Sequence, residues 1–275
     1  MQLLPRLTTL ALLLMLIPTP SGAGEVPTFA RDPAPVRSGA PIFRFNGKDL
    51  TGFYTFTRYQ KYDDRLGVFR VEDGIVRVSG REFGGFATQE SFSNYHLIVE
   101  WRWAGGTCPP RRWRARNSGV MVHGSGPDGA AFASWMESIE CQIIEGGTGD
   151  LIVVPAKGKA SPRLTAEVRR GSDGQPYFQR GNPPVEHGAG RINWWGRDAS
   201  WKDVLWFRGE ADLERPVGEW NRMEVVCDGD SITVLLNGTL VNAATRSSLT
   251  SGKILFQSEG AAIDFRTIEV RPLLK

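Results

Sequence analysis

Short runs of alternating apolar and polar residues, separated by turn residues, constrain the fold of this chain more than any other feature. Two turns are typical of β-hairpins, Asp228-Gly229-Asp230 and Asn237-Gly238. We predict strands over residues 67–71, 74–79, 95–103, 119–123, 139–144, 151–155, 222–227, 231–236, 253–257 and 262–270. Neither a useful length of helical periodicity nor an internal repeat accompanies them. The pattern therefore predicts an all-β fold, an antiparallel β-sandwich, rather than a parallel sheet with crossover helices.

The chain divides into three parts by composition. Residues 1–23 combine a positive charge at Arg6, an apolar run and a small-residue ending, which is typical of a signal peptide. Residues 24–40 are rich in Pro, Ala and Gly and are interpreted as an N-terminal arm or linker. Residues 41–275 form one predicted domain, because β-sandwiches often reach this size. We expect an exported protein, periplasmic or secreted, without membrane insertion, because the apolar run is shorter than a transmembrane helix needs.

Charge and cysteine content exclude several classes of protein. The net charge of +3 is small and spread along the chain, which argues against a nucleic-acid partner. One dense basic run, residues 111–116, is interpreted as a solvated loop, with contact to an acidic sugar or a phosphate as the alternative. The three cysteines, Cys108, Cys141 and Cys227, allow at most one internal disulfide bond in an oxidising compartment. Cys141 and Cys227 lie in apolar strand patterns and are predicted to be buried.

The segment from Trp135 to Asp150 contains the predicted centre of the site. Alternation along its strand sends Glu140 and Gln142 to one sheet face, and Cys141 to the other. Since a sandwich buries one face of each sheet, the carboxylate and the amide are expected on the outer face. This polar face is typical of either a solvated surface or a binding site.

Other predicted strands send further polar side chains outward by the same rule. If these strands neighbour that of Glu140, a single face gathers amides, a histidine and carboxylates with few lysines, a set suited to sugar hydroxyls. Besides Glu100, the side chains predicted to join Glu140 and Gln142 on this face are Arg102, Asn117, His123, Gln257 and Glu259.

Several motifs in order resemble the 3-keto-disaccharide hydrolase domain family. They are the stretches 45–53 (FNGKDLTGF), 116–120 (RNSGV), 139–150 (IECQIIEGGTGD), 218–221 (GEWN), 237–242 and 256–272. The resemblance covers nearly all of residues 40–275. It implies a jelly-roll sandwich of the concanavalin A-like lectin/glucanase type, whose concave sheet binds sugar. A carbohydrate substrate is thereby implied, and no role follows for the Trp-rich region 176–216.

The resemblance also implies a chemistry. A keto group at C3 acidifies the proton at C2, so a base can remove it while the glycosidic oxygen leaves C1, after which water adds back. Glu140 or His123 is expected to be the base, and the other, or Glu145, the acid. The expected donors to the developing enolate are Arg102, Asn117 and Gln142. A glycoside 3-oxidoreductase would be the functional partner that makes the keto substrate.

Two alternatives stay open. Residues 140–145 resemble the E-x-D-x-x-E signature of laminarinase-like glucanases, but Gln142 stands where that family has Asp. Moreover, Glu140 and Glu145 would lie about 16 Å apart on opposite faces of a regular strand, and a retaining pair needs about 5 Å. The second alternative is a non-catalytic carbohydrate-binding module of lectin type, with tryptophans such as Trp194 and Trp195 stacking on sugar rings.

No cofactor motif is found. The sequence lacks zinc spacing, a phosphate-binding loop, a nucleotide fingerprint and a Ser-His-Asp arrangement, so no metal ligand is assigned. A structural calcium ion held by carboxylates such as Asp150 is the one ion that the sequence leaves open.

Overall fold

The computed structural model describes residues 25–31 and 33–274. The predicted signal segment, residues 1–23, lies outside them.

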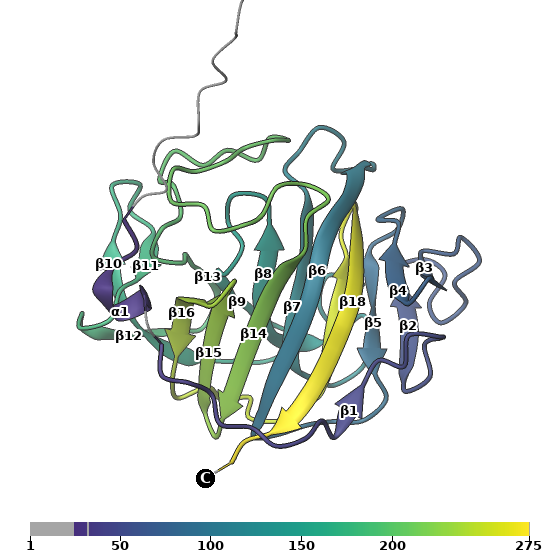
Figure 1. The fold of residues 1–275 in the computed structure, drawn as a ribbon, viewed down its shortest axis with the longest axis horizontal. Coiled ribbons are helices and arrows are strands. Elements are labelled where there is room, and N and C mark those ends of the chain that lie inside the picture. Colours follow the sequence, from purple (N-terminus) through teal and green to yellow (C-terminus); the bar gives the residue numbers. More distant parts are fainter. Residues whose placement is uncertain (1–24, 32, 275) are drawn as a thin grey trace, which may run out of the picture.

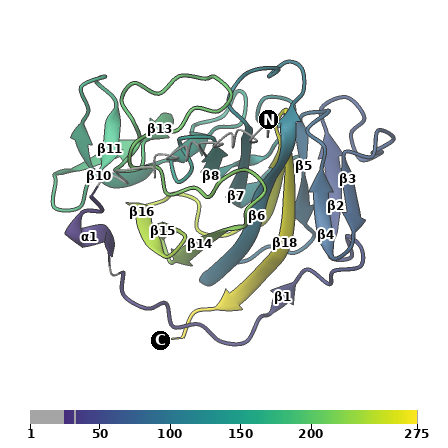
Figure 2. The ribbon, with the colours of Figure 1, turned by 45° about the horizontal axis from the view of Figure 1, so that its top comes forward.

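Two antiparallel sheets stack face to face (Figures 1 and 2). The eight-stranded sheet runs β16 (Thr239–Ala244), β15 (Ser231–Leu236), β14 (Asn221–Asp228), β6 (Tyr95–Thr107), β18 (Ala261–Pro272), β4 (Ile75–Val78) and β3 (Phe69–Glu72), with β1 (Phe43–Arg44) also paired to β18. The seven-stranded sheet runs β13 (Gly190–Ile192), β9 (Leu151–Val154), β8 (Glu137–Ile144), β7 (Asn117–Ser125), β17 (Lys253–Ser258), β5 (Gly84–Thr88) and β2 (Phe53–Thr57). The predicted all-β antiparallel sandwich of jelly-roll type is confirmed.

Apolar side chains from both sheets fill the space between the layers. The core cluster includes Trp101 and Phe265 of one sheet and Phe86 and Phe256 of the other. Phe86 and Phe256 stack with ring centroids 4.7 Å apart. Each Å² of apolar surface that these side chains bury stabilises the fold by about 25 cal/mol. This burial is the main contribution that holds the two layers together.

A second, smaller apolar cluster lies on the other face of the seven-stranded sheet. Met121 and Leu255 point there from β7 and β17, and Trp135 covers them from the loop before β8. The seven-stranded sheet is therefore covered on both faces, and the loop that carries Trp135 crosses its outer face. This outer face, turned away from the core, bears the cavity described below.

Turn chemistry fixes the hairpin between β15 and β16 as predicted. Asn237 and Gly238 both have positive φ, 51° and 84°, the combination that a two-residue type I′ turn requires. All ten predicted strands exist within a few residues of their predicted bounds. Alternation did not reveal β1, β2, β5, β16 or the strands β10 to β13 between residues 164 and 192.

A third sheet of three strands packs at one side of the sandwich, beside the short helix α1 (Thr28–Arg31) (Figure 1). Its strands, in spatial order, are β11 (Pro176–Phe178), β10 (Leu164–Arg170) and β12 (Pro184–His187). Ala30 of α1 is fully buried, and the ring of Phe29 meets Phe178 edge-on at 5.8 Å. The predicted N-terminal arm thus packs on the domain instead of hanging free as a linker.

Candidate active site

A cavity of about 650 Å³ crosses the outer face of the seven-stranded sheet. Its lining follows the order of the strands, from β13 and β9 over β8 and β7 to residues just beyond β17 and just before β5. Its polar lining consists of Arg58, Arg111, Asn117, Glu140, Gln142, Arg191, Asp203 and Glu259. Four of the predicted site residues, Asn117, Glu140, Gln142 and Glu259, therefore share one cavity.

Strand pairing explains why these side chains meet. In the register of β7 and β8, Asn117 is opposite Ile144 and Gly119 is opposite Gln142, with Glu140 two residues further along. Side chains two residues apart share one face of a strand. Cys141, between Glu140 and Gln142, is fully buried in the core cluster. The predicted alternation of this strand, with Cys141 packed inside, is confirmed.

Gly119 forms the floor beneath the acidic group. A Cβ atom at this position would lie 2.4 Å from Oε1 of Glu140 and 2.7 Å from Oε1 of Gln257. Both side chains therefore occupy the space that any other residue would fill. Gln257, 1% exposed, lies behind Glu140 and does not line the cavity itself.

Two of the three carboxyl groups that line the cavity, those of Glu140 and Glu259, have raised pKa values. Burial raises the pKa of Glu140 to about 8, and the negative charge of Glu259 adds to the effect. Burial also raises the pKa of Glu259, to about 7, although the positive charges of Arg111 and Arg191 oppose it. Because these values lie close to neutral pH, one group can hold a proton while the other is ionised, as a general acid and a general base require.

Four buried polar atoms in this region have no hydrogen-bond partner within the described chain. They are Oδ1 of Asn117, Oε1 of Glu140, Oε1 of Gln142 and Oε1 of Gln257. A buried polar atom without a partner costs about 1–3 kcal/mol, so such atoms are rare in folded proteins. Three of the four, those of Asn117, Glu140 and Gln142, belong to the cavity lining, and as acceptors on neighbouring strands they suit a ligand with several hydroxyl donors.

Two segments that the sequence assigned no role close the cavity. Arg111, from the predicted solvated loop, donates to Oδ1 of Asp203 at 2.7 Å. Arg191 of β13 forms an ion pair with Asp150 at 2.8 Å. The solvated-loop interpretation is therefore wrong for Arg111. In the sequence, Arg111 was marked only by the dense basic run, and Arg191 only by its place in the Trp-rich region.

The tryptophans of region 176–216 do not form an exposed platform. Trp194 and Trp195 are buried in the core cluster. Trp201 lines the cavity, and its indole donates to the backbone oxygen of Glu145 at 2.9 Å. Trp206 is 62% exposed.

The prediction that His123 shares the face of Glu140 is wrong. A bulge interrupts the pairing of β7 and β8 between Val122 and Ser125, and His123 has a φ of 56°. An extra residue in a strand reverses the alternation beyond it. The imidazole consequently lies between the sheets, 5.8 Å from the ring of Tyr95, and its Nδ1 donates to Leu249 O at 2.7 Å. Burial lowers the pKa of His123, which favours a neutral structural imidazole.

Arg102 also lies away from the cavity, because β6 belongs to the eight-stranded sheet and is not a neighbour of β8. Its side chain contacts Asp264 at 3.0 Å on the outer face of that sheet. The guanidinium carbon is 4.6 Å from the ring centroid of Trp220. Arg102, like Glu100 on the same strand, therefore cannot donate to a ligand beside Glu140.

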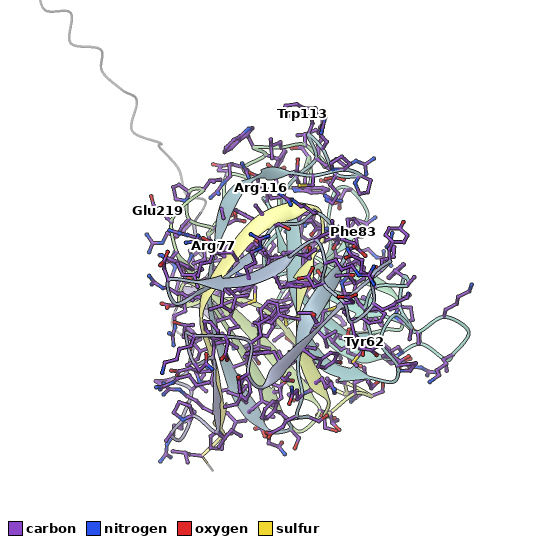
Figure 3. All side chains as sticks on the ribbon, turned by 90° about the vertical axis from the view of Figure 1, so that its right-hand side faces the viewer. Tyr62, Arg77, Phe83, Trp113, Arg116 and Glu219 are labelled. Carbon is purple, nitrogen blue, oxygen red and sulfur yellow. The ribbon has the colours of Figure 1, made fainter. Side chains whose placement is uncertain are left out.

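Glu145 is held in a buried ion pair outside the cavity lining. Its carboxylate accepts hydrogen bonds from a guanidinium nitrogen and the backbone nitrogen of Arg116, and from the backbone nitrogen of Trp206. Both side chains of the pair are 1% exposed. Arg116 directly precedes β7, and Figure 3 shows it at the same end of the sandwich as Trp113. Glu145 thus joins two loops and is not available to a ligand in this cavity.

Among the residues that the structure describes, no group of three His, Cys, Asp or Glu side chains is arranged to hold a metal ion. Asp150, the carboxylate considered for calcium, accepts from the side chains of Arg191 and Arg197 and from the backbone nitrogen of Trp194. The Asp150 carboxylate is therefore already neutralised by two guanidinium groups, which take the place that a calcium ion would have. No helix in the described part of the chain has the length and apolar character needed to cross a bilayer.

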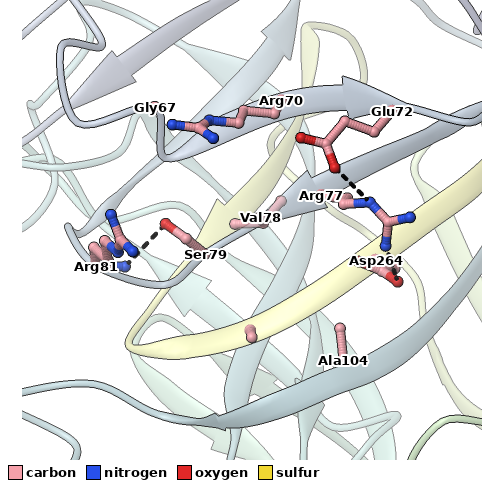
Figure 4. Close-up of a pocket in the computed structure, with 10 residues that line it drawn as sticks. Gly67, Arg70, Glu72, Arg77, Val78, Ser79, Arg81, Ala104 and Asp264 are labelled. Carbon is pink, nitrogen blue, oxygen red and sulfur yellow. Dashed lines mark hydrogen bonds and ion pairs between the residues drawn. The ribbon is translucent and has the colours of Figure 1, made fainter.

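A smaller cavity of about 300 Å³ lies on the outer face of the eight-stranded sheet (Figure 4). Arg70, Arg77 and Arg81 line it. Arg77 is paired with Glu72 at 3.1 Å and with Asp264 at 3.4 Å. Its charge is thus neutralised within the protein, and the cavity lacks the unpartnered buried acceptors found around Glu140.

Comparison with known proteins gives a family and a fold. The family model for the 3-keto-alpha-glucoside-1,2-lyase-like domain matches residues 41–271. A protein of unknown function with a galectin-like fold from Bacillus subtilis superimposes with a TM-score of 0.51 at 10% identity, covering 88% of this chain and 100% of that chain. A candidate glycosyl hydrolase from Parabacteroides distasonis gives 0.49 at 18% identity, over 84% and 92% of the two chains. The comparison with curated protein sequences gave no match.

Proposed function

Since this chain belongs to the family of 3-keto-alpha-glucoside-1,2-lyase-like domains, we propose that it cleaves the glycosidic bond of 3-keto-glycosides, including 3-keto-disaccharides. The observation that carries the proposal is the pair formed by Glu140 and Glu259 in one cavity. Their pKa values of about 8 and about 7 suit one proton donor and one proton acceptor near neutral pH.

The proposed reaction proceeds by elimination and hydration. Glu259 removes the proton at C2, which the C3 ketone acidifies, and Glu140 protonates the oxygen that leaves C1. The electron pair of the broken C2–H bond forms the C1=C2 double bond. Water then adds across that bond, with its hydroxyl at C1 and its proton at C2, and gives the free 3-keto sugar.

Three donors of the cavity would stabilise the negative charge that develops on the C3 oxygen. The amides of Asn117 and Gln142 and the guanidinium of Arg191 line the same cavity as Glu140 and Glu259. Preorganised donors of this kind are worth about 3–4 kcal/mol each when aimed at a developing oxyanion. The three replace the set predicted from sequence, in which Arg102 stood in place of Arg191.

The position of Glu145 weakens the glucanase alternative. A retaining glycosidase needs a second carboxylate about 5 Å from the first, and the buried ion pair with Arg116 removes Glu145 from that role. The lectin alternative differs in its requirement for Glu140. A binding module has no need of an acid with a raised pKa, whereas an elimination requires one.

The test is a product assay on 3-keto-glucosides beside their unoxidised parents, with wild type and the Glu140→Gln variant. We expect cleavage of the keto substrates alone, and a loss of about 10²–10⁴-fold in the variant. Glu137→Gln, the same change three residues earlier on β8 and outside the cavity lining, is the matched control. Equal turnover of the unoxidised glycosides would favour the glucanase, and binding without turnover in the wild type would favour the lectin.

The proposal also includes a source for the substrate and a cellular location. The keto substrate has to come from a glycoside 3-oxidoreductase, because oxidation at C3 must precede elimination. The apolar segment near the N-terminus supports action in the periplasm or outside the cell.

A further inference from the structure

An aromatic wall forms part of the same cavity. It consists of Phe83, Phe132 and Trp135, all three in the cavity lining. Phe83 and Trp135 are stacked, with centroids 6.0 Å apart and planes at 26°, and Phe132 meets Trp135 edge-on at 6.1 Å. Phe132 is 64% exposed. A large apolar side chain held open to solvent inside a cavity is a common mark of a binding surface.

The loop that presents Phe132 is strained. Phe132 and Ala133 both have positive φ, 51° and 59°, a conformation that is unfavourable for any residue with a side chain. Arg58 holds the loop in place, because its Nε donates to Ser134 Oγ at 3.0 Å and its Nη2 donates to Phe132 O at 3.1 Å. The same guanidinium lies 4.9 Å from the ring centroid of Phe83. The unfavourable backbone conformation thus keeps the ring of Phe132 exposed, at some cost in stability.

The chemistry of the wall differs from that of the acidic part of the cavity. The indole nitrogen of Trp135 already donates to Gly84 O at 2.7 Å. Val154 packs in the same apolar cluster as Trp135, and neither Val154 nor Pro155 in the lining brings a side-chain hydrogen-bonding group. The guanidinium of Arg58, which also lines the cavity, already donates to Ser134 Oγ and Phe132 O. A second sugar ring has several hydroxyls that need partners when they leave water. A planar apolar group needs none and gains from stacking on aromatic rings.

From this contrast we propose that the aromatic wall binds the leaving group, and that the preferred substrates are 3-keto-glycosides with an aromatic or similarly planar apolar aglycone. The inference rests on the proposed function and names its substrate class. The polar part of the cavity holds the keto sugar beside Glu140, and the free phenol or alcohol departs along the wall.

The first test compares kcat/KM for an aryl 3-keto-glucoside and for a 3-keto-disaccharide in wild type and in Phe132→Ala. We expect the wild type to prefer the aryl substrate. The variant should lose about tenfold on the aryl substrate, the effect of roughly one lost aromatic contact, and less than threefold on the disaccharide. Tyr59→Ala, which removes a ring that is 79% exposed and outside this cavity lining, is the control and should change neither value.

A second test uses binding without turnover. We expect 4-nitrophenol to quench tryptophan fluorescence through Trp135 in the wild type, and Phe132→Ala to weaken its binding. If the keto-glycosides are cleaved but the variant affects both substrate classes equally, the aromatic site is wrong while the proposed function stands. If 4-nitrophenol binds at the wall but no keto-glycoside is cleaved, the proposed function fails and the aromatic site stands.

Discussion

At the scale of single residues, the carboxyl group of Glu140 links the chemistry of the cavity to the stability of the fold. Its pKa is about 8 in the folded protein and has an ordinary value of 4.5. The folded state therefore binds more protons than the unfolded state between these values. By linkage, this group makes the free energy of unfolding fall as the pH rises from about 4.5 to about 8.

The first prediction concerns Glu140→Gln, whose amide resembles the protonated acid in shape. The variant should match the wild type in stability at pH 4 and should be more stable at pH 8, because it has no carboxylate to desolvate. Urea unfolding at pH 4, 6 and 8 measures the difference. A stability difference that does not change with pH would show that the carboxyl titrates normally.

The second prediction concerns Gly119→Ala. The new methyl group would collide with Glu140 and Gln257 at 2.4 and 2.7 Å, so we expect kcat/KM to fall at least tenfold, since a displacement of about 1 Å can cost about 100-fold. Stability should change less than activity, because both obstructed atoms are the far ends of flexible side chains. Gly106→Ala is the control, because a Cβ there meets nothing within 4 Å. Unchanged activity in Gly119→Ala would place the reaction elsewhere.

At the scale of elements, the ends of the strands are held by buried ionic contacts rather than by catalytic groups. Glu145, directly after β8, joins Arg116, directly before β7, to the backbone of Trp206. Removing one partner of a buried pair leaves an uncompensated charge, which costs about 3–5 kcal/mol.

The third prediction follows for Glu145→Ala, which should lose about 3–5 kcal/mol of stability, as measured by chemical unfolding. The double variant Arg116→Met with Glu145→Leu should recover part of this loss, because it leaves no buried charge, although the backbone nitrogens of Arg116 and Trp206 still lose their acceptor. Folded molecules of the double variant should keep their activity on 3-keto-glucosides. Inactive but fully stable Glu145→Ala would instead support the glucanase pair.

At the scale of the whole molecule, the cavity is assembled from segments far apart in the sequence. Arg191 on β13 faces carboxyl groups from β8 and from the turn after β17, and its charge lowers the pKa of both Glu140 and Glu259. The proposed mechanism therefore predicts a bell-shaped pH profile of kcat/KM with limbs near 7 and 8.

The fourth prediction is that Arg191→Gln moves both limbs of this profile to higher pH by about one unit, the usual effect of one nearby charge. The control is Arg180→Gln, which changes an exposed arginine between β11 and β12 that does not line the cavity. This variant should leave the pH profile unchanged. A profile that does not move in Arg191→Gln would show that other groups titrate in the reaction.

The sequence by itself determined the sandwich and the strand at the centre of the candidate site. Alternation is a local property of each strand, so it correctly sent Glu140 and Gln142 outward and Cys141 inward. The Asn237-Gly238 turn was equally readable, because positive φ at two successive residues selects these residue types.

Only the tertiary structure decided which outward-facing residues meet. The sequence does not say which sheet a strand joins, so Arg102 was placed on the wrong sheet. A single bulge reversed the face of His123, because the side-chain period of two leaves no tolerance for an extra residue. Arg191 and Phe132 lie outside long alternating strands. Pairing of the short strand β13 with β9 brings Arg191 to the cavity, and the loop before β8 brings Phe132 to it, and both are non-local events.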